Sequence, residues 1–142
     1  MKTVQQLLAT KSTLVYSVTP NTLVLEALQF MMEKNISSLL VQENNALLGI
    51  FTERDYARKI VLQGKSSAST LIEEVMTSEL TTVKLRDSIE NCMKIMTDRR
   101  IRHLPVVENN EVKGLVSIGD VVKFIIEDQK QTINALENYI NS

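Results

Sequence analysis

The amino-acid sequence predicts a mixed α/β (α+β) protein built from two pseudo-symmetric copies of one β-α-β-β-α unit. Three observations predict this fold. Residues 18–60 match residues 83–125 at a constant offset of 65 without a gap. Each copy contains two short apolar segments separated by an Asn-Asn pair, and each contains apolar residues at helical spacing. Because a small sheet with one apolar face is not stable alone, we expect the copies to pack sheet to sheet.

The repeat is supported by residue identities along its whole length. Eleven of the 43 aligned pairs are identical, against about three expected by chance from average residue usage. The identical pairs include Met31 with Met96 and Asp55 with Asp120. We therefore expect residues 1–65 to form the first repeat and residues 66–142 the second, together making one domain.

The same order of elements is expected in both copies. An extended segment comes first, and a helix, two hairpin strands and a second helix follow. In the first copy these elements are expected at 14–18, 22–34, 37–42, 47–52 and from 53. In the second copy they are expected at 80–83, 87–99, 102–107, 112–117 and from 118. Asparagines 44, 45, 109 and 110 fall in the hairpin turns, where Asn tolerates the left-handed backbone conformation. No Gly or Pro follows Asp120, so an extended C-terminal helix is expected to reach about Tyr139. Short helices at 4–9 and 71–76 are expected to lead into the copies.

Composition and charge exclude several classes of function. The formal net charge is −1, so no global positive field attracts nucleic acid or anionic lipid. No apolar run approaches the roughly 20 residues that span a bilayer, and the N-terminal residues do not resemble a secretory signal. Cys92 is the only cysteine, which excludes an internal disulfide and a cysteine-based zinc site. We expect a soluble cytoplasmic protein without nucleic-acid or membrane partners.

Each copy carries the pattern Gly-apolar-apolar-Thr/Ser-x-x-Asp, at residues 49–55 and 114–120. One interpretation is a helix capping box, which is common at helix starts. The other is a ligand site, because the hydroxyl and the carboxylate follow a strand, where α/β folds bind ligands. A carboxylate suits the hydroxyls of a ribose better than a phosphate, and glycine in a strand permits close approach by a ligand. The two interpretations can both hold.

Basic side chains near these motifs could contact phosphates. They are Arg54 and Arg58, one helical turn apart, and the cluster Arg99, Arg100, Arg102 and His103. A solvated basic face is the alternative interpretation. Pro105 cannot donate a hydrogen bond to a sheet, so its strand is expected at an edge or a rim. No nucleophile, metal cluster or glycine-rich phosphate loop accompanies the carboxylates, so neither catalysis nor a metal site is expected.

With these motifs, the sequence resembles a tandem pair of cystathionine-β-synthase (CBS) domains, also called a Bateman module, over residues 4–128. The resemblance rests on the pattern above in both copies, on the segment Ile-Arg-His-Leu-Pro-Val at 101–106, and on the order of elements. Small stand-alone bacterial CBS-pair proteins are the subgroup to which it is most similar. The family implies a non-catalytic regulatory protein that needs no cofactor. It also implies two clefts between the copies that bind AMP, ATP or NAD(H), a regulated partner protein, and pairing into a homodimer.

By matched position, the resemblance also implies the ligand-binding residues. Asp55 and Asp120 would accept hydrogen bonds from the ribose, helped by Thr52 and Ser117. The residues bordering the adenine would be Tyr16, Val18, Ser38, Thr81, Val83, His103 and Leu104. The residues facing phosphates would be Arg54, Arg58, Arg102 and His103, and the expected site is completed by Pro105, Ile118 and Gly119.

The two copies differ at the basic positions, and we therefore expect two unequal sites. Gly119 in the second copy stands where the first copy has Arg54. The favoured site is the one around Ser117 and Asp120, with Arg54 reaching in from the first copy. An alternative is a ligand-free dimerisation or interaction protein, which the apolar positions between residues 121 and 140 motivate. A nucleotide hydrolase is a third hypothesis, without a visible catalytic constellation.

Overall fold

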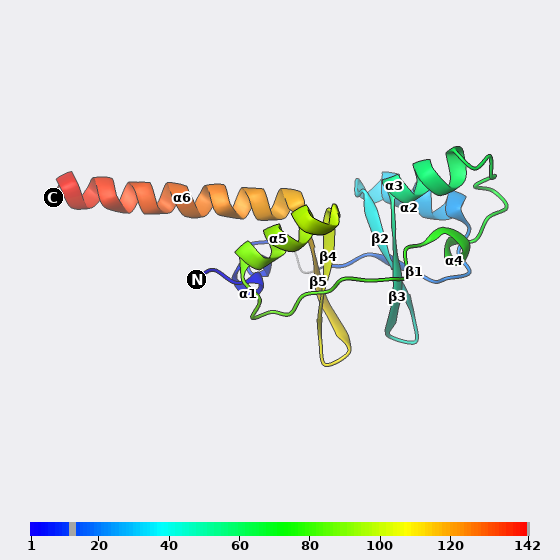
Figure 1. The fold of residues 1–142 in the computed structure, drawn as a ribbon, viewed down its shortest axis with the longest axis horizontal. Coiled ribbons are helices and arrows are strands. Elements are labelled where there is room, and N and C mark those ends of the chain that lie inside the picture. The colour runs from blue at the N-terminus through cyan, green and yellow to red at the C-terminus, as the bar shows by residue number, and fades with distance from the viewer. Residues whose placement is uncertain (12–13, 142) are drawn as a thin grey trace. The chain divides into compact units, whose positions relative to one another are not determined.

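The computed structural model describes residues 1–11 and 14–141. Its elements, drawn in Figure 1, are α1 (Val4–Leu8), β1 (Ser17–Val18), α2 (Val24–Lys34), β2 (Ser38–Glu43), β3 (Ala46–Thr52), α3 (Glu53–Asp55), the π-helix η1 (Tyr56–Val61), α4 (Ile72–Val75), α5 (Ile89–Arg99), β4 (His103–Glu108), β5 (Glu111–Ser117) and α6 (Ile118–Asn141). One sheet has the order β1-β2-β3, and β4 pairs with β5 in the other. The predicted α/β class, the repeated order of elements and the extended C-terminal helix are confirmed.

Contacts divide the chain into two compact units. Unit 1 consists of Met1–Thr13, Thr82–Glu108 and Lys113–Ser142, and unit 2 consists of Leu14–Thr81 and Asn109–Val112. The predicted division at residue 65 follows the sequence repeat and stays a prediction. The sheet-to-sheet packing of the two copies also stays a prediction.

The two short helices that lead into the repeats are both present, and each packs on the other repeat. In unit 1, the backbone N–H of Val4 donates to the carbonyl of Asp87 at 2.9 Å, and α1 buries its apolar side chains in the core of the second repeat. In unit 2, the N–H of Ile72 donates to the carbonyl of Thr22 at 2.8 Å, and α4 joins the core of the first repeat. Each repeat is thus completed by the lead-in segment that precedes its sister copy.

The core of unit 2 forms where α2 covers the three-stranded sheet. Parallel β1 and β2 are joined through α2, and β2 and β3 form an antiparallel hairpin. Apolar residues of α2 at helical spacing, Val24, Ala27 and Met31, are buried against residues of β2 and β3. Phe51 of β3 is fully buried in the same cluster. The predicted helical periodicity of this segment is confirmed.

Both hairpins turn on asparagine pairs, as predicted. The φ angles are 52° and 65° at Asn44 and Asn45, and 50° and 64° at Asn109 and Asn110. Two successive residues with positive φ make the type I′ turn, whose twist matches that of the flanking strands. Because asparagine tolerates this region better than most residues, the turn chemistry fixes the register of both hairpins.

Pro105 explains why the second sheet is smaller than the first. In the first copy, the N–H of Leu40 donates to the carbonyl of Tyr16 at 3.3 Å, which helps to form β1. Pro105 occupies the position of Leu40 and has no N–H to donate. Its carbonyl still accepts from the N–H of Val83 at 3.0 Å, and only an isolated bridge from Val83 to Val106 forms there. The backbone of Pro105 therefore faces the edge of β4 that does not pair with β5, as expected for a proline in a strand.

The helices that follow β3 and β5 differ in length and winding. After β3, the three residues of α3 are followed by a π-helix, in which the N–H of Leu62 donates to the carbonyl of Ala57. After β5, α6 runs for 24 residues. π-Helical turns are rare and are frequent at functional sites. Here the π-helix carries Lys59 beside the carboxylate of the Thr/Ser-x-x-Asp motif.

Candidate ligand-binding site

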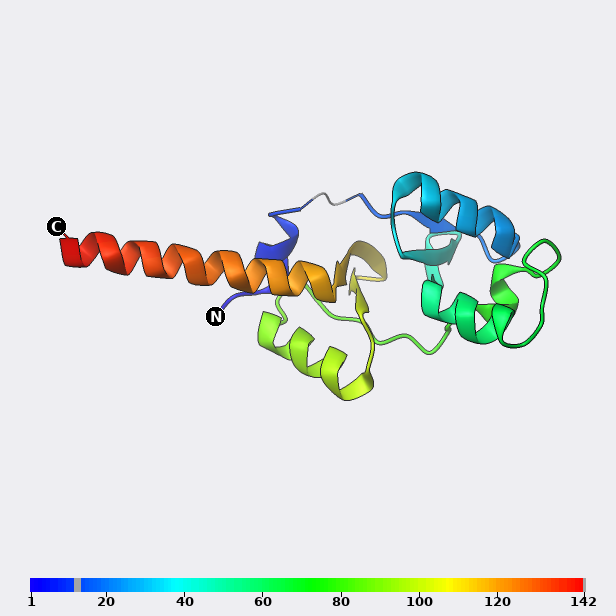
Figure 2. The same cartoon turned by 90° about the horizontal axis from the view of Figure 1, so that it is seen from above.

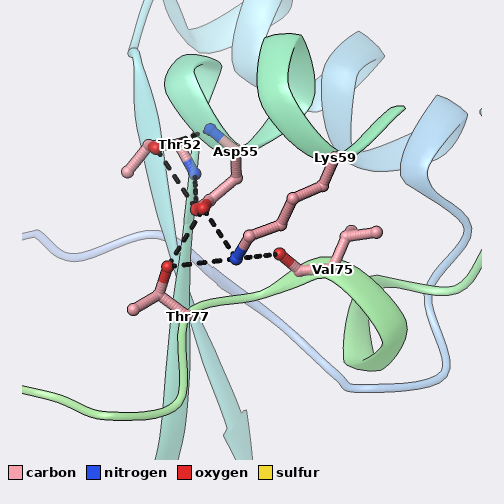
Figure 3. A network of polar contacts seen from close by, with 5 residues as sticks. All are labelled: Thr52, Asp55, Lys59, Val75 and Thr77. Atoms are coloured by element: carbon pink, nitrogen blue, oxygen red, sulfur yellow. Dashed lines mark hydrogen bonds and ion pairs between the residues drawn. The ribbon is translucent and has the colours of Figure 1, made fainter. Parts of the chain in front are cut away.

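The Thr-x-x-Asp motif of the first repeat forms a reciprocal cap at the start of α3 (Figure 3). The backbone N–H of Asp55 donates to the Thr52 hydroxyl at 3.2 Å, and the N–H of Thr52 donates to Asp55 Oδ2 at 3.1 Å. Thr52 ends β3 in extended conformation, so its hydroxyl faces the free N–H groups of the helix. The capping-box interpretation is confirmed for this motif.

Further donors occupy the other oxygen of the same carboxylate. The hydroxyl of Thr77 donates to Asp55 Oδ1 at 3.0 Å, and Lys59 Nζ lies 3.0 Å from it. Lys59 also donates to the carbonyl of Val75 at 3.0 Å, which ties the π-helix to the end of α4 (Figure 3). Asp55 is 7% exposed. Its two oxygens are therefore buried and satisfied by groups of the protein itself.

The Ser-x-x-Asp motif of the second repeat makes the equivalent cap in unit 1. The N–H of Asp120 donates to the Ser117 hydroxyl at 3.1 Å, and the N–H of Ser117 donates to Asp120 Oδ2 at 2.9 Å. Here too a lysine contacts the carboxylate, since Lys11 Nζ donates to Asp120 Oδ2 at 2.6 Å and to the carbonyl of Leu115 at 2.9 Å. The two repeats thus place a lysine on the capping aspartate from different parts of the chain.

The two carboxylates differ in how far solvent reaches them. The side chain of Asp120 is 27% exposed and that of Asp55 is 10% exposed. Burial acts to raise the pKa of Asp120, but the hydrogen bonds from Lys11 and from the Ser117 N–H outweigh it and hold the pKa below its usual value. Asp120 is therefore an ionised hydrogen-bond acceptor with part of its surface open.

His103 and Arg102 lie near this carboxylate, at the start of β4. The N–H of Ile118 donates to the carbonyl of Arg102 at 2.9 Å, which holds the first turn of α6 against β4. Burial lowers the pKa of His103, the charge of Asp120 acts against that effect, and Arg102 and Lys11 add to it. The imidazole is therefore neutral at pH 7, and its charged neighbours are the Asp120 carboxylate, Arg102 and Lys11.

The remaining predicted site residues are divided between the two units. In unit 2, Ser38 is buried and lies opposite Thr52 in the hairpin, and the ring of Tyr16 packs edge-on against Phe30 with a centroid distance of 5.6 Å. Arg54 and Arg58 are exposed on α3 and η1. Val18 and Thr81 are half-buried. The structure therefore brings Ser38 and Thr52 together with Asp55.

In unit 1, the predicted residues fall into a buried and an exposed group. Leu104 is fully buried and Val83 is 2% exposed, and both belong to the core of unit 1; Pro105 is also buried. Ile118 and Gly119 are exposed at the start of α6. The predicted approach of Arg54 to Asp120 joins residues of different units and stays a prediction.

The strand glycines of the motif make room for the lead-in segments. A Cβ atom on Gly49 would lie 2.7 Å from Met76 Sδ and 2.9 Å from the carbonyl oxygen of Thr77. A Cβ atom on Gly114 would lie 2.8 Å from a methyl carbon of Leu8. The expected close approach at these glycines is thus made by the chain itself.

A groove of about 470 Å³ lies beside the second motif, within unit 1. Its lining includes Lys2, Lys11, Lys123, Phe124 and Asp120. Asp120 connects the groove to the capping motif. The mixture of charged groups and one aromatic ring gives the groove no single preference for cations or anions.

Sequence reasoning missed three residues of these networks: Lys11, Lys59 and Thr77. Lys59 could have been found, because it follows Asp55 by four residues, the spacing of helical ion pairs. Lys11 lies 109 positions from Asp120, so no local pattern connects them. Thr77 reaches Asp55 only because α4 packs on the first repeat.

Two features are absent from residues 1–11 and 14–141, the part of the chain that the structure describes. No helix in these ranges is both long and apolar enough to cross a membrane. No group of three or more His, Cys, Asp and Glu side chains in these ranges is arranged to hold a metal ion. Cys92 lies in the core of unit 1, and burial, together with the charge of Asp87, raises the pKa of its thiol to about 11.

Several solved structures resemble this chain in fold. A CBS-domain protein from Burkholderia ambifaria MC40-6 is 46% identical, with a TM-score of 0.87, over 90% of this chain and 96% of that one. The CBS domain pair of protein MJ0100, solved in complex with 5′-methylthioadenosine and S-adenosyl-L-methionine, is 25% identical with a TM-score of 0.79, over 90% of this chain and 98% of that one.

Curated relatives and a family model agree with the structural likeness. The CBS domain-containing protein YhcV of Bacillus subtilis is 35% identical over 79% of both chains. The mitochondrial CBS domain-containing protein CBSX3 of Arabidopsis thaliana is 43% identical over 82% of this chain, which spans 59% of that relative. The CBS domain model matches residues 11–62 and 72–127. The chain belongs to the CBS-domain family and contains a tandem pair of these domains.

Proposed function

We propose that this chain is a non-catalytic regulatory protein that binds an adenosine-containing ligand, of the AMP, ATP or NAD(H) type, and acts on a partner protein. Asp120 is the carboxylate that accepts hydrogen bonds from the ribose hydroxyls. The observation that carries this choice is the difference in exposure between Asp120 and Asp55, 27% against 10% for their side chains. Asp120 is also held ionised, and charge-assisted hydrogen bonds are the stronger kind.

The surroundings of Asp120 also suit a nucleotide. At the start of β4, the pKa of His103 responds to the charges of both Asp120 and Arg102. A neutral imidazole can donate or accept one hydrogen bond, and a guanidinium can bind phosphate through two. The related pair in MJ0100 was solved with two adenosine derivatives, which supports the same ligand class for this chain.

Ligand binding must compete with Lys11. Its ammonium group lies 2.6 Å from Asp120 Oδ2, the oxygen that also accepts the Ser117 N–H. A ribose would therefore take the other oxygen or displace the lysine. Displacement of Lys11 would release the segment that follows α1 from Asp120. Ligand binding would in this way change the surface of the protein.

Calorimetric titration with AMP, ATP, NAD(H) and S-adenosylmethionine tests the proposal. We expect Asp120→Asn to weaken binding at least about tenfold, because the charged acceptor contributes roughly 1.5–3 kcal/mol. The matched variant Asp55→Asn should leave the affinity nearly unchanged. No binding of any of these ligands at millimolar concentration would refute the proposal.

A second candidate is a ligand-free interaction protein that forms homodimers. The exposed apolar residues on α6 favour it, among them Ile133 at 53% and Leu136 at 57%. Light scattering of the chain, compared with a variant truncated after Asp128, tests it. A monomer in both cases would remove this role.

A further inference from the structure

The second half of α6 carries apolar side chains into solvent. Every residue from 131 to 141 is exposed, including Ile133 at 53%, Leu136 at 57% and Ile140 at 78%. Nearer the start of the helix, Val122 and Ile126 are 43% and 47% exposed. Single exposed apolar residues are ordinary on protein surfaces, but a continuous row on one helix indicates a contact surface.

The spacing of this row is that of a coiled coil. Positions 122, 126, 129, 133, 136 and 140 are separated by four and three residues in alternation. This places Ile126, Ile133 and Ile140 at the a positions of a heptad, and it places Val122, Gln129 and Leu136 at the d positions. These six residues are called the seam below. A strict a/d seam is narrower than the apolar face that a helix turns to a globular core, and it fits one partner helix.

Unit 1 packs on other faces of α6 and does not use the seam. Val121 is buried in the core, with Phe124 and Ile125 against it. Asp120, Phe124 and Gln131 line the groove beside α1, roughly opposite the seam at 3.6 residues per turn. Figure 2 shows α1 and α5 beside the first half of α6 only.

We propose that α6 pairs in parallel with α6 of a second copy of this chain, as a short two-stranded coiled coil from Val122 to Ile140. All three a positions are isoleucine and the d position 136 is leucine, and isoleucine at a with leucine at d favours two parallel strands. In a parallel pair each core residue meets its own copy, so Gln129 meets Gln129. A side-chain amide is both donor and acceptor, so the two can bond to each other.

The polar seam position also selects the direction of pairing. An antiparallel pair in the same register would place Gln129 against Ile133 and leave its amide unpaired in an apolar layer, which is unfavourable. A single polar core residue is a known device for fixing register.

The flanking charges are compatible with a parallel pair of identical helices. In such a pair, each g position faces the e position of the next heptad on the other helix. These contacts join Ile125 with Lys130 and Thr132 with Glu137. Each contact pairs one charged with one uncharged side chain, so no like charges oppose the pairing. The pairing does not depend on the nucleotide proposal.

Cysteine cross-linking tests the proposal. Leu136→Cys is made in a Cys92→Ala background, alanine being the residue that the first repeat has at the equivalent Ala27. At a d position of a parallel pair, the two cysteines lie within disulfide distance. We expect mild oxidation to convert most of the chain to a covalent dimer. The matched variant Asn138→Cys, on the far face of the same helical turn, should form little of it.

A second substitution separates the seam from any other dimer contact. Ile133→Asp, added to the Leu136→Cys chain, should abolish the cross-link, whereas the neighbouring change Asn134→Asp should preserve it. The result should be the same without nucleotide and with Asp120→Asn, which keeps this test independent of ligand binding.

Three results would overturn the proposal. One is cross-linking of Leu136→Cys no faster than that of Asn138→Cys. Another is efficient cross-linking between an Ile126→Cys chain and a Leu136→Cys chain, which only antiparallel pairing allows. The third is a light-scattering mass of the unmodified protein at the 16.0 kDa of one chain.

Discussion

Lys11 and Asp120 lie 109 positions apart in the sequence, yet the lysine Nζ is 2.6 Å from the carboxylate Oδ2. In the first repeat the corresponding aspartate, Asp55, pairs with Lys59 only four residues further on. The position equivalent to Lys59 is Phe124 in the second repeat, and Lys11 belongs to the lead-in segment before the aligned residues 18–60. The two repeats thus pair equivalent carboxylates with lysines from different places. In the first repeat the lysine lies on the following helix, and in the second it lies on the lead-in segment of the other repeat.

Removing Lys11 should raise the pKa of Asp120. The depressed pKa contributes stability that is present above the unfolded value of about 3.9 and is lost as the pH falls through the folded value. We expect Lys11→Met to cost about 1 kcal/mol at pH 7, because the pair is half-exposed, and to cost less at pH 3. Urea unfolding and an NMR titration of Asp120 measure both effects. Lys2→Met, which removes a more exposed pair with Asp128, should change little.

Asp55 should contribute more to stability than Asp120. Asp55→Ala removes the cap of α3, and it removes the buried carboxylate that accepts from Thr77 and pairs with Lys59. We expect a loss of about 3 kcal/mol in the free energy of unfolding, against about 1 kcal/mol for Asp120→Ala. Urea unfolding followed by circular dichroism compares the two. Equal losses would contradict the assignment of Asp55 to a mainly structural role.

His103 should make stability depend on pH near neutrality. Burial lowers its folded pKa, so the unfolded chain binds the proton more readily. Its contribution is present above the unfolded pKa of about 6.5 and is lost as the pH falls below that value toward the folded pKa. His103→Gln should therefore flatten the stability profile between pH 7 and 5. An unchanged slope in thermal unfolding across this range would contradict the prediction.

Arg100 should be replaceable with a gain in stability. It ends α5 in the left-handed conformation with φ 55°, as Asn35 ends α2 with the same φ. Arginine tolerates this conformation less well than asparagine, so Arg100→Asn should stabilise by about 1 kcal/mol. The reverse change, Asn35→Arg, should destabilise by a similar amount. Arg99→Asn, which removes the same charge inside the helix, should bring no gain. Melting temperatures of the three variants decide this.

The two motif glycines should differ in their tolerance of alanine. Gly49→Ala meets the carbonyl oxygen of Thr77 at 2.9 Å, and the hydrogen-bonded backbone cannot move easily. Gly114→Ala meets only the end of the Leu8 side chain, which can rotate. We expect losses of about 3 and 1 kcal/mol respectively, within the range for overpacked cores. Similar losses for both variants, measured by urea unfolding, would show that Leu8 is held as rigidly as backbone.

Sequence reasoning predicted the local features of the fold because each depends on a few neighbouring residues. The asparagine turns, the capping motifs and the helical periodicity of α2 follow from backbone preference and burial within one segment. The length of α6 follows from the absence of Gly and Pro after Asp120. The π-helix after Asp55 has no comparable signature in the sequence, and the bond from its Lys59 to the carbonyl of Val75 joins it to a different segment.

The candidate site was predicted only in part, for a related reason. Its carboxylates could be predicted because the motif repeats in the sequence. Lys59 has the four-residue spacing of a helical ion pair, but Lys11 could not be predicted, because this partner of Asp120 comes from the segment after α1. The role of Gly49 was also obscured, because the group that approaches it belongs to residues 76 and 77. Contacts with the lead-in segments thus account for most of what sequence reasoning missed.

The crossing of the two lead-in segments limits how the chain can be divided. A polypeptide that held one lead-in and one repeat could not place its own helix in its own core, and its buried side chains would require a second molecule. Two such molecules would exchange their helices, as domain-swapped dimers do. Joining them end to end gives the connectivity of this chain. The fragments 1–65 and 66–142, produced separately, should therefore be soluble and folded only when they are mixed.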